Sequence, residues 1–418
     1  MSHPAGTGPI REQRFFAENA FMDEQRTLRI ALLAVGVFVT GCGGEEDLEL
    51  PDGPPPFVKT VPFRPSLPVS FVKIELGHSH TCGRVADGRT FCMGLNDYGQ
   101  LGTLDPMRRC VSGMQPCTPT PLAVSTGVQF EALGLSQRYS CGLAASGEAY
   151  CWGFGLGGQL GDGLRTSSPT PVRVATSERF RAISHGNASV NTCAISQQGQ
   201  VHCWGVGIDG LNGNGTEDVA TTPVAVATTV RMQQVGVGQF SVCALAESGE
   251  IYCWGRNVYG MLGQGAPVSS LVPLKVVGGR QYTALAVGAV HVCALDTEQR
   301  AWCWGSPINV GTAVPGMQEG VSTPQAVDGG RRYIAITAGS GHTCALDEAR
   351  AAWCWGNGGP LGDGTEGIRI SPVLVAGGLQ YLQISAGGTA TCGIVTDGTL
   401  ACWGSNYYGQ MGFTPGDP

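Results

Sequence analysis

Cysteine is the residue type with the most regular spacing in this chain, and its thiol can form disulfides, bind metal or act as a nucleophile. The 418 residues contain 17 cysteines, and fourteen of these form seven pairs whose partners are ten residues apart. The pairs are Cys82 with Cys92, Cys141 with Cys151, Cys193 with Cys203, Cys243 with Cys253, Cys293 with Cys303, Cys344 with Cys354 and Cys392 with Cys402. Cys110 and Cys117 lie together in the segment 103–118, and Cys42 stands alone.

The spacing of the pairs favours disulfides over zinc. Each pair brackets a turn sequence such as Ala86-Asp87-Gly88 between runs of β-forming residues, which predicts a β-hairpin. Residues equidistant from the midpoint of a hairpin face each other across its strands, within disulfide range. Zinc sites use Cys or His roughly two to five residues apart in paired sets, and one hairpin supplies only two ligands. We therefore expect a disulfide in every hairpin, and another between Cys110 and Cys117.

Glycine positions predict the type of turn in these hairpins. A glycine one residue past the midpoint fits a type I turn closed by a bulge, because the bulge position needs a positive φ. Five hairpins have this glycine: Gly88, Gly147, Gly199, Gly249 and Gly398. The other two have Gln299 and Arg350, so we expect those two turns to differ.

Histidines offer little support for an enzyme. His80, His291 and His342 occupy one repeated position, two residues before a paired cysteine, and repetition indicates a structural role. The chain has no GxSxG, HExxH or phosphate-binding loop. We therefore expect no catalytic residues, no enzyme activity and no cofactor.

Two further groups of residues could bind small ligands. The Asp162-Gly163 and Asp363-Gly364 turns and the segment 212–218 could hold calcium, but ordinary turn chemistry explains these residue types, so we expect no metal. Rows of Trp and Tyr could stack on sugars. Their alternation along the strands favours the core instead.

The elements that position the cysteines are short strands. Side chains alternate along a strand, so Cys151 points to one face while Tyr150 and Trp152 point to the other. That aromatic face needs a neighbouring copy to cover it. Successive cysteine pairs are 48 to 59 residues apart, a period typical of propeller blades. Each period begins with a Pro-led strand and a strand opened by Phe, Met or Tyr, and the two hairpin strands follow. This predicts four strands per blade, with each Pro-led strand in the blade of the hairpin after it.

The ends of the chain predict how the ring closes. A final Pro-led strand is missing after Gly412, whereas Pro62 lies nine residues before Phe71, the same interval as in the other copies. We expect residues near 58–66 to complete the blade of the C-terminal hairpin. Proline suits such an outer strand, where a missing N–H costs little.

The repeats resemble a known family. The sequences GHSHTC at 77–82, GSGHTCAL at 339–346 and the run from Tyr252 to Gly263 are similar to regulator of chromosome condensation repeats, and the resemblance covers residues 62–418. It implies an all-β, seven-bladed β-propeller over residues 58–418. The Gly-rich run after each Trp would be the crossing between blades. The eukaryotic founder of the family is a guanine-nucleotide exchange factor, the role that we consider least supported for this chain.

The N-terminus predicts export. Ten apolar residues at 30–39 follow Arg26 and Arg29 and are too few to span a bilayer. The ending Val39-Thr40-Gly41-Cys42 resembles a bacterial lipoprotein signal, so residues 1–41 would be removed and Cys42 would carry the lipid, with Met22 as a possible start. The acidic, Pro-rich segment 42–57 is interpreted as a tether. We expect a location at the cell envelope, on the outer membrane or cell surface.

The segment 103–118 is the least repetitive feature of the chain. A disulfide-stapled loop with Arg108, Arg109 and Met114 would make a contact surface of low conformational entropy. We expect a monomeric, non-enzymatic scaffold that binds a protein or cell-wall component through its loops. The alternative is a sugar-binding or metal-dependent protein, or a hydrolase, with its site at the central channel. The net charge of −7 and the lack of basic clusters exclude nucleic acid as the expected partner.

Overall fold

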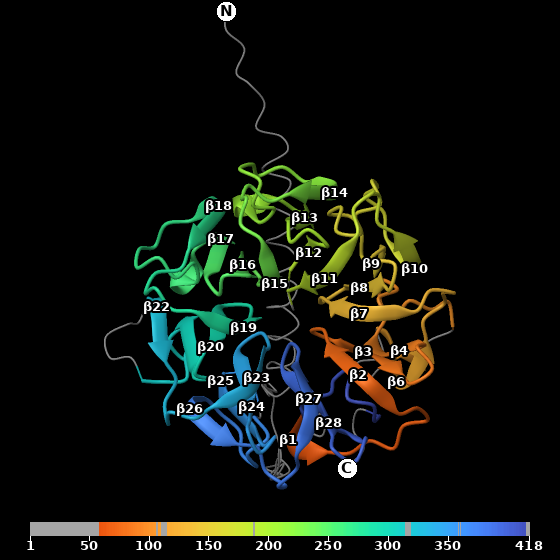
Figure 1. Ribbon diagram of the computed structural model, residues 1–418. Helices are drawn as coiled ribbons and strands as arrows, with labels where there is room; N and C mark the ends of the chain where they lie inside the picture. The colour runs from red at the N-terminus through yellow and green to blue at the C-terminus, as the bar shows by residue number, and fades with distance from the viewer. Residues whose placement is uncertain are drawn as a thin grey trace, which may run out of the picture. The chain divides into compact units, whose positions relative to one another are not determined.

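The computed structural model describes residues 58–105, 108–109, 115–186, 189–313, 319–357, 359 and 361–414. These residues form a ring of seven antiparallel sheets around a central axis (Figure 1). The predicted all-β propeller with four strands per blade is confirmed. The predicted signal, Cys42, the tether, Cys110 and Met114 lie outside the described residues. Within the described residues, no helix is long and apolar enough to cross a membrane.

Each blade has four strand positions from the axis outward. From the first blade to the seventh, the innermost strands are β2 (Phe71–Leu76), β7 (Phe130–Leu135), β11 (Phe180–His185), β15 (Met232–Val237), β19 (Tyr282–Val287), β23 (Tyr333–Ala338) and β27 (Tyr381–Ala386). The second strands are β3 (His80–Val85), β8 (Tyr139–Ala144), β12 (Asn191–Ser196), β16 (Ser241–Ala246), β20 (His291–Asp296), β24 (His342–Asp347) and β28 (Ala390–Val395).

The outer half of each blade follows the same order. The third strands are β4 (Thr90–Leu95), β9 (Ala149–Gly153), β13 (Val201–Gly205), β17 (Ile251–Gly255), β21 (Ala301–Gly305), β25 (Ala352–Gly356) and β29 (Leu400–Ser405). The outermost strands are β6 (Pro116–Ala123), β10 (Ser168–Arg173), β14 (Ala220–Ala225), β18 (Ser270–Lys275), β22 (Val321–Ala326), β26 (Arg369–Leu374) and β1 (Val58–Phe63). The first blade adds β5 (Arg108–Arg109), and two short 3-10 helices, η1 (Ile208–Gly210) and η2 (Val258–Gly260), lie in the connections.

The sequence period and the structural blade are out of phase. The period groups each Pro-led strand with the hairpin that follows it. In the structure β10, which contains Pro171, pairs with β9 of the preceding hairpin, with Val172 opposite Cys151. The grouping was therefore wrong by one strand, because a repeat period does not say where a blade begins. The predicted outer position of these proline strands is confirmed.

The ring closes through the two ends of the propeller. Strand β1 pairs with β29, with Val58 opposite Ser405 and Phe63 opposite Cys402. Figure 1 shows this orange strand within the blue C-terminal blade. The Phe63 and Phe413 rings lie 4.5 Å apart, centroid to centroid. The predicted closure by residues near 58–66 is therefore confirmed.

Each blade carries one disulfide between its second and third strands. The bonded cysteines are direct cross-strand partners, with Cα atoms 4.0–4.1 Å apart, which is typical of non-hydrogen-bonded positions. Every hairpin pair that the spacing predicts is bonded. The bonds join Cys82 to Cys92, Cys141 to Cys151, Cys193 to Cys203, Cys243 to Cys253, Cys293 to Cys303, Cys344 to Cys354 and Cys392 to Cys402.

The eighth predicted disulfide involves the segment 103–118. Cys117 is bonded to another cysteine, and its side chain is buried. Its predicted partner, Cys110, lies outside the described residues. The pairing of these two cysteines therefore stays a prediction.

In six blades a tryptophan follows the third-strand cysteine and packs against the preceding blade, and Met93 takes its place in the first blade. Six such indoles are fully buried: Trp152, Trp204, Trp254, Trp304, Trp355 and Trp403. The Trp204 Nε1–H donates to the Gln159 carbonyl at 3.0 Å, across the boundary between blades. Gly161 lies against the same ring with φ +69°, and a Cβ there would come within 2.6 Å of the indole nitrogen. The Gly-rich run is therefore the platform that covers the next indole, as the core interpretation of these residues requires.

Two hairpin turns correct the sequence prediction. Gln299 and Arg350 adopt φ +65° and +61°, the left-handed conformation that glycine takes in the other hairpins. Their N–H groups donate to Asp296 and Asp347 carbonyls, as Gly147 N–H donates to Ala144. The expected difference in turn type was therefore wrong. The physical reason lies in Asp296, whose Oδ1 accepts two backbone N–H groups at 2.9 Å and holds the turn without glycine.

We expect Gln299→Gly to raise the free energy of unfolding by about 1 kcal/mol, because it removes a side chain from the left-handed region. The reverse change, Gly398→Ala, should lower it by about 1–2 kcal/mol through backbone strain alone, since an added Cβ there meets nothing within 4 Å. Urea unfolding of the two variants and the parent measures both effects. A neutral Gly398→Ala variant would contradict this account of the turns.

Candidate functional site

The propeller presents two distinct faces. The turn face is defined by the hairpin turns and the loops that enter each next blade, which contact each other: Phe180 N–H donates to the Gly147 carbonyl at 2.8 Å. The connection face lies at the opposite ends of the strands and holds the Gly-rich runs. A partner that binds the turn face therefore contacts different residues from a partner that binds the connection face.

The segment 103–118 extends the first blade at the connection face. Strand β5 pairs with β6, with Arg108 opposite Cys117 and Arg109 opposite Pro116. Strand β6 is held in turn by β4, with Cys117 opposite Leu95. This sheet has five strands where the other sheets have four. The structure thus places the backbone of the predicted Arg108–Arg109 pair on the outer edge of one blade.

The repeated histidines link neighbouring blades. His80 Nε2 hydrogen-bonds with Ser140 Oγ at 2.7 Å in the next blade. His291 Nε2 bonds Thr343 Oγ1 at 2.7 Å, and His342 Nε2 bonds Thr391 Oγ1 at 2.8 Å. Burial lowers the pKa of His80 and of His291 to about 3 and the pKa of His342 to about 4. All three are neutral near pH 7, and their bonds support the structural role that repetition predicts.

These histidines predict a loss of stability in acid. As the pH falls below about 6.5, the unfolded chain takes up protons that the buried imidazoles cannot, so each histidine costs about 1.4 kcal/mol per pH unit until its folded pKa is reached. Between about pH 6.5 and 4.5, we expect His342→Gln to make the free energy of unfolding depend less steeply on pH. The slope should fall by about 1.4 kcal/mol per pH unit, which corresponds to one bound proton. Urea unfolding at several pH values measures the slope. An unchanged slope would refute the assignment.

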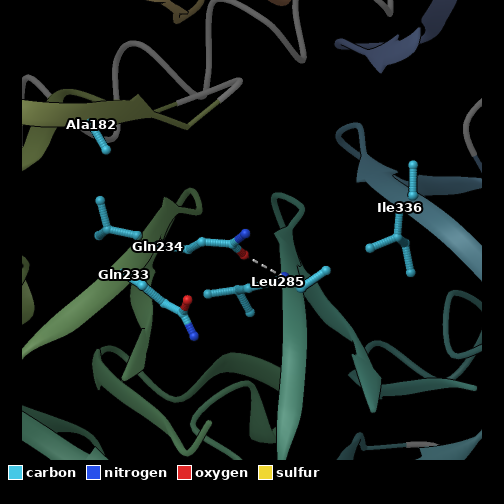
Figure 2. A pocket seen from close by; sticks show the side chains of 8 residues that line it. Ala182, Gln233, Gln234, Leu285 and Ile336 are labelled. Carbon is cyan, nitrogen blue, oxygen red and sulfur yellow. Dashed lines mark hydrogen bonds between the residues drawn. The ribbon is translucent and has the colours of Figure 1, made fainter. Parts of the chain in front are cut away.

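A pocket lies beside the axis between the innermost strands (Figure 2). Its volume is about 380 Å³. Strands β11, β15, β19 and β23 supply its lining: Ala182, Gln233, Gln234, Val235, Ala284, Leu285, Ala335 and Ile336. Gln234 Oε1 accepts the Leu285 N–H at 2.8 Å, and Gln233 Nε2 donates to the Ala246 carbonyl at 3.0 Å. None of these lining residues titrates, so they offer no general acid or base.

One cluster of potential metal ligands was not apparent from the sequence. Ligand atoms of Cys141, Cys151 and His185 lie within 4.8 Å of one another. Both sulfurs belong to a disulfide, so they are not thiolates and cannot act as ordinary zinc ligands. Sequence spacing could not reveal the cluster, because His185 belongs to the next blade.

The turns considered for calcium use their carboxylates locally. Asp162 Oδ1 accepts the Leu164 N–H at 3.0 Å. Asp363 accepts the Thr365 N–H at 3.0 Å and the Arg369 Nε–H at 2.8 Å. These contacts support the turn chemistry that the residue types favour.

Two arginine–tryptophan stacks on the turn face were also missed at the level of sequence. The Arg280 guanidinium carbon lies 3.4 Å from the centroid of Trp302, and that of Arg331 lies 3.5 Å from the centroid of Trp353. The available signal was the Trp-Cys-Trp triplet, which only these two repeats contain. A guanidinium held on an indole face is stabilised by cation–π attraction and remains able to donate from its edges.

Comparisons with known proteins agree with this architecture. Models of the regulator of chromosome condensation (RCC1) repeat match residues 71–100, 232–260, 333–359 and 382–410, and also 146–190 and 248–295. The human and mouse E3 ubiquitin-protein ligases HERC2 are each 28% identical over 129 residues, 30% of this chain. The chain spans about 2% of the length of these curated relatives.

Solved structures show the same fold. Human WBSCR16 superimposes with a TM-score of 0.69 at 18% identity, covering 83% of this chain and 89% of that one. Prp20p from Saccharomyces cerevisiae gives a TM-score of 0.65 at 19% identity, covering 79% and 81%. The four shorter matches each contain one hairpin cysteine pair. The chain therefore contains segments that match RCC1 repeat models, and it folds as a seven-bladed propeller.

Proposed function

We propose that this protein is a non-enzymatic binding propeller that is exported and held at the bacterial cell envelope by a lipid on Cys42. It engages a protein or cell-wall partner through the segment 103–118. The observation that carries the proposal is the fifth strand of the first blade, a departure from an otherwise regular ring. Irregular loops on a rigid scaffold are where binding residues concentrate.

The disulfides support the proposed compartment. Seven pairs are bonded and fully buried in the blades. Disulfides persist in oxidising compartments and are rare in the cytosol. This agrees with the lipoprotein-like signal at residues 30–42, and it argues against an intracellular nucleotide-exchange role.

The chemistry of the described interior supports binding over catalysis. The axial pocket has amides and apolar groups, and the amides already bond backbone groups. The repeated histidines are buried, neutral and bonded between blades. A hydrolase needs a group that can move a proton within reach of substrate. The alternative of a sugar-binding, metal-dependent or hydrolytic site at the channel therefore has less support.

The test of the binding surface is the combined variant Arg108→Ala, Arg109→Ala and Met114→Ala. We expect it to lose the partner that the parent captures from a membrane fraction, as identified by mass spectrometry. The matched control is Arg165→Ala with Arg256→Ala, which removes two exposed arginines from connections of other blades. The same partner set from both variants would overturn the assignment of the site. Hydrolysis in a substrate screen would instead favour the channel alternative.

The anchor has a separate test. We expect Cys42→Ala to move the protein from the membrane fraction to the soluble fraction, because the acyl chains supply the membrane affinity. Retention of the variant in the membrane fraction would refute lipidation at Cys42. This result would leave the binding role of segment 103–118 open to its own experiment.

A further inference from the structure

We propose that the turn face of the fifth and sixth blades is a second interaction surface, which binds an acidic segment of another protein. The surface consists of Arg280, Arg300, Arg331, Arg332 and Arg350, and we call it the arginine surface. All five side chains are exposed. It lies on the opposite face from segment 103–118 and is independent of it.

The repeats themselves supply the first argument, because the other five blades serve as internal controls. Four positions change together in the fifth and sixth blades alone. Trp302 and Trp353 stand where the other blades have Phe91, Tyr150, His202, Tyr252 and Ala401. Asp296 and Asp347 replace Val85, Ala144, Ser196, Ala246 and Val395. Gln299 and Arg350 replace the turn glycines, and Arg280 and Arg331 replace Val69, Val128, Glu178, Val230 and Leu379.

In the fifth blade the changed residues are joined by hydrogen bonds and a cation–π contact. Asp296 Oδ1 accepts the N–H groups of Glu298 and Arg300, both at 2.9 Å. Asp296 Oδ2 accepts the Trp302 Nε1–H at 2.9 Å, which fixes the indole. The Arg280 guanidinium carbon then lies 3.4 Å from the centroid of that indole. The backbone N–H groups of the turn therefore orient the Asp296 carboxylate, and this carboxylate orients the Trp302 indole. The indole in turn positions the Arg280 guanidinium.

The sixth blade repeats the unit. Asp347 Oδ1 accepts the Ala349 and Ala351 N–H groups at 3.0 and 2.9 Å, and Oδ2 accepts the Trp353 Nε1–H at 2.9 Å. Arg331 lies 3.5 Å from that indole. Gln299 and Arg350 are two of the four non-glycine residues with positive φ in the described part of the chain, and backbone strain of this kind is found at functional positions.

The two units form a continuous surface. Arg300 and Arg332 form an isolated antiparallel bridge between the blades. The Tyr333 N–H also donates to the Gln299 carbonyl at 2.8 Å. Among the ion pairs of the described residues, none involves Arg280, Arg331, Arg332 or Arg350. Arg300, in contrast, pairs with Asp296 at 2.9 Å and with Glu298 at 3.3 Å. Arg350 Nη1 donates to the Tyr381 carbonyl at 3.5 Å. Arg280, Arg331 and Arg332 are therefore the guanidinium groups of this surface that can meet an external anion.

The chemistry selects an acidic protein segment as the occupant. A guanidinium presents a planar fork of N–H donors that matches a carboxylate, and stacking removes much of the entropy that binding would otherwise cost. The same turns contain Asp296, Glu298, Asp347 and Glu348, so the five arginines have little excess charge. Nucleic acids and anionic membranes bind surfaces with a large excess of positive charge, which this surface lacks. A segment with two carboxylates can meet both stacked guanidinium groups, Arg280 and Arg331.

The test is selection of a random dodecapeptide library on the folded protein, followed by affinity measurement of the enriched peptides. We expect enriched peptides to carry at least two Asp or Glu residues. Arg280→Gln with Arg331→Gln should weaken them by about tenfold or more, and Arg280→Lys with Arg331→Lys should weaken them by a similar factor, because lysine lacks the fork.

The control variant is Arg179→Gln with Arg231→Gln, which removes two arginines from the turn face of other blades where they pair with Glu148 and Glu247. It should leave the affinity within about twofold of the parent, as should Arg108→Ala with Arg109→Ala. Thermal unfolding verifies that each variant is folded. Enrichment without acidic residues, equal binding by the Gln variant, or binding only to anionic vesicles or polyphosphate would each overturn the proposal.

Discussion

Deleting residues 58–66 is expected to abolish the single cooperative unfolding transition of the propeller. The deletion removes β1, the outer strand of the seventh blade, and exposes the edge of β29. It also removes Phe63, which packs against the core around Met93 and Phe413, and Arg64, which pairs with Asp397 at 2.9 Å. We expect a loss on the order of 5 kcal/mol or more, comparable with the total stability of many domains. Urea unfolding followed by far-UV circular dichroism measures it.

The ring-opening deletion has a matched control and a rescue. Deleting residues 43–53 should leave the transition unchanged, because β1 remains. Adding a peptide of sequence 58–66 to the opened ring should restore part of the stability, since an exposed strand edge accepts a new strand. An opened ring that unfolds at the same urea concentration as the parent would show that closure by β1 contributes little.

Trp254→Ala is expected to lower the free energy of unfolding by about 3–5 kcal/mol, the range for truncation of a large buried aromatic side chain. Trp254 is fully buried and donates to the Leu211 carbonyl at 3.1 Å, so its loss leaves a cavity and an unpaired acceptor between two blades. The control is Tyr252→Ala, two residues earlier on the same strand and only half-buried. Its cost should be smaller by about half, because less area returns to water.

Equal losses in these two variants would contradict the role given to the buried indoles. In that case, the free energy of unfolding would depend on burial along the whole strand rather than on the contact between blades. The same comparison can be made with Trp302→Ala, whose indole is half-buried on the turn face.

Much of this architecture follows from local sequence signals. A disulfide across a hairpin depends only on the residues between its cysteines, so the ten-residue spacing predicts it well. The closing strand was found because the interval from Pro62 to Phe71 copies the other repeats. Both predictions rest on distances along the chain.

Features that depend on contacts between distant residues were harder to predict. The turn at Gln299 keeps the shape of the glycine turns because the Asp296 carboxylate accepts its neighbours' N–H groups. The stack of Arg280 on Trp302 joins a loop to a strand 22 residues later, with no motif to mark it. The offset of the blades arises because each proline strand pairs backward, and a period carries no information about phase.

The candidate binding site was only partly accessible to sequence reasoning. The insertion 103–118 stands out because it breaks the period, and the structure gives it a strand on the edge of the first blade. The arginine surface breaks no period, since its residues replace others one for one. Comparing equivalent positions across the repeats is what separates it from ordinary surface charge.

Each of the seven cystines joins two strands of one blade, so no seam between blades is covalent in these pairs. A propeller pulled by its ends would therefore lengthen in steps as blades detach, while every hairpin stays closed by sulfur. Each disulfide closes a loop with a sequence separation of 10. It therefore shortens the fully extended chain by about 35 Å. Such a protein unfolds stepwise under force, and its disulfide-closed hairpins favour refolding when the force is removed.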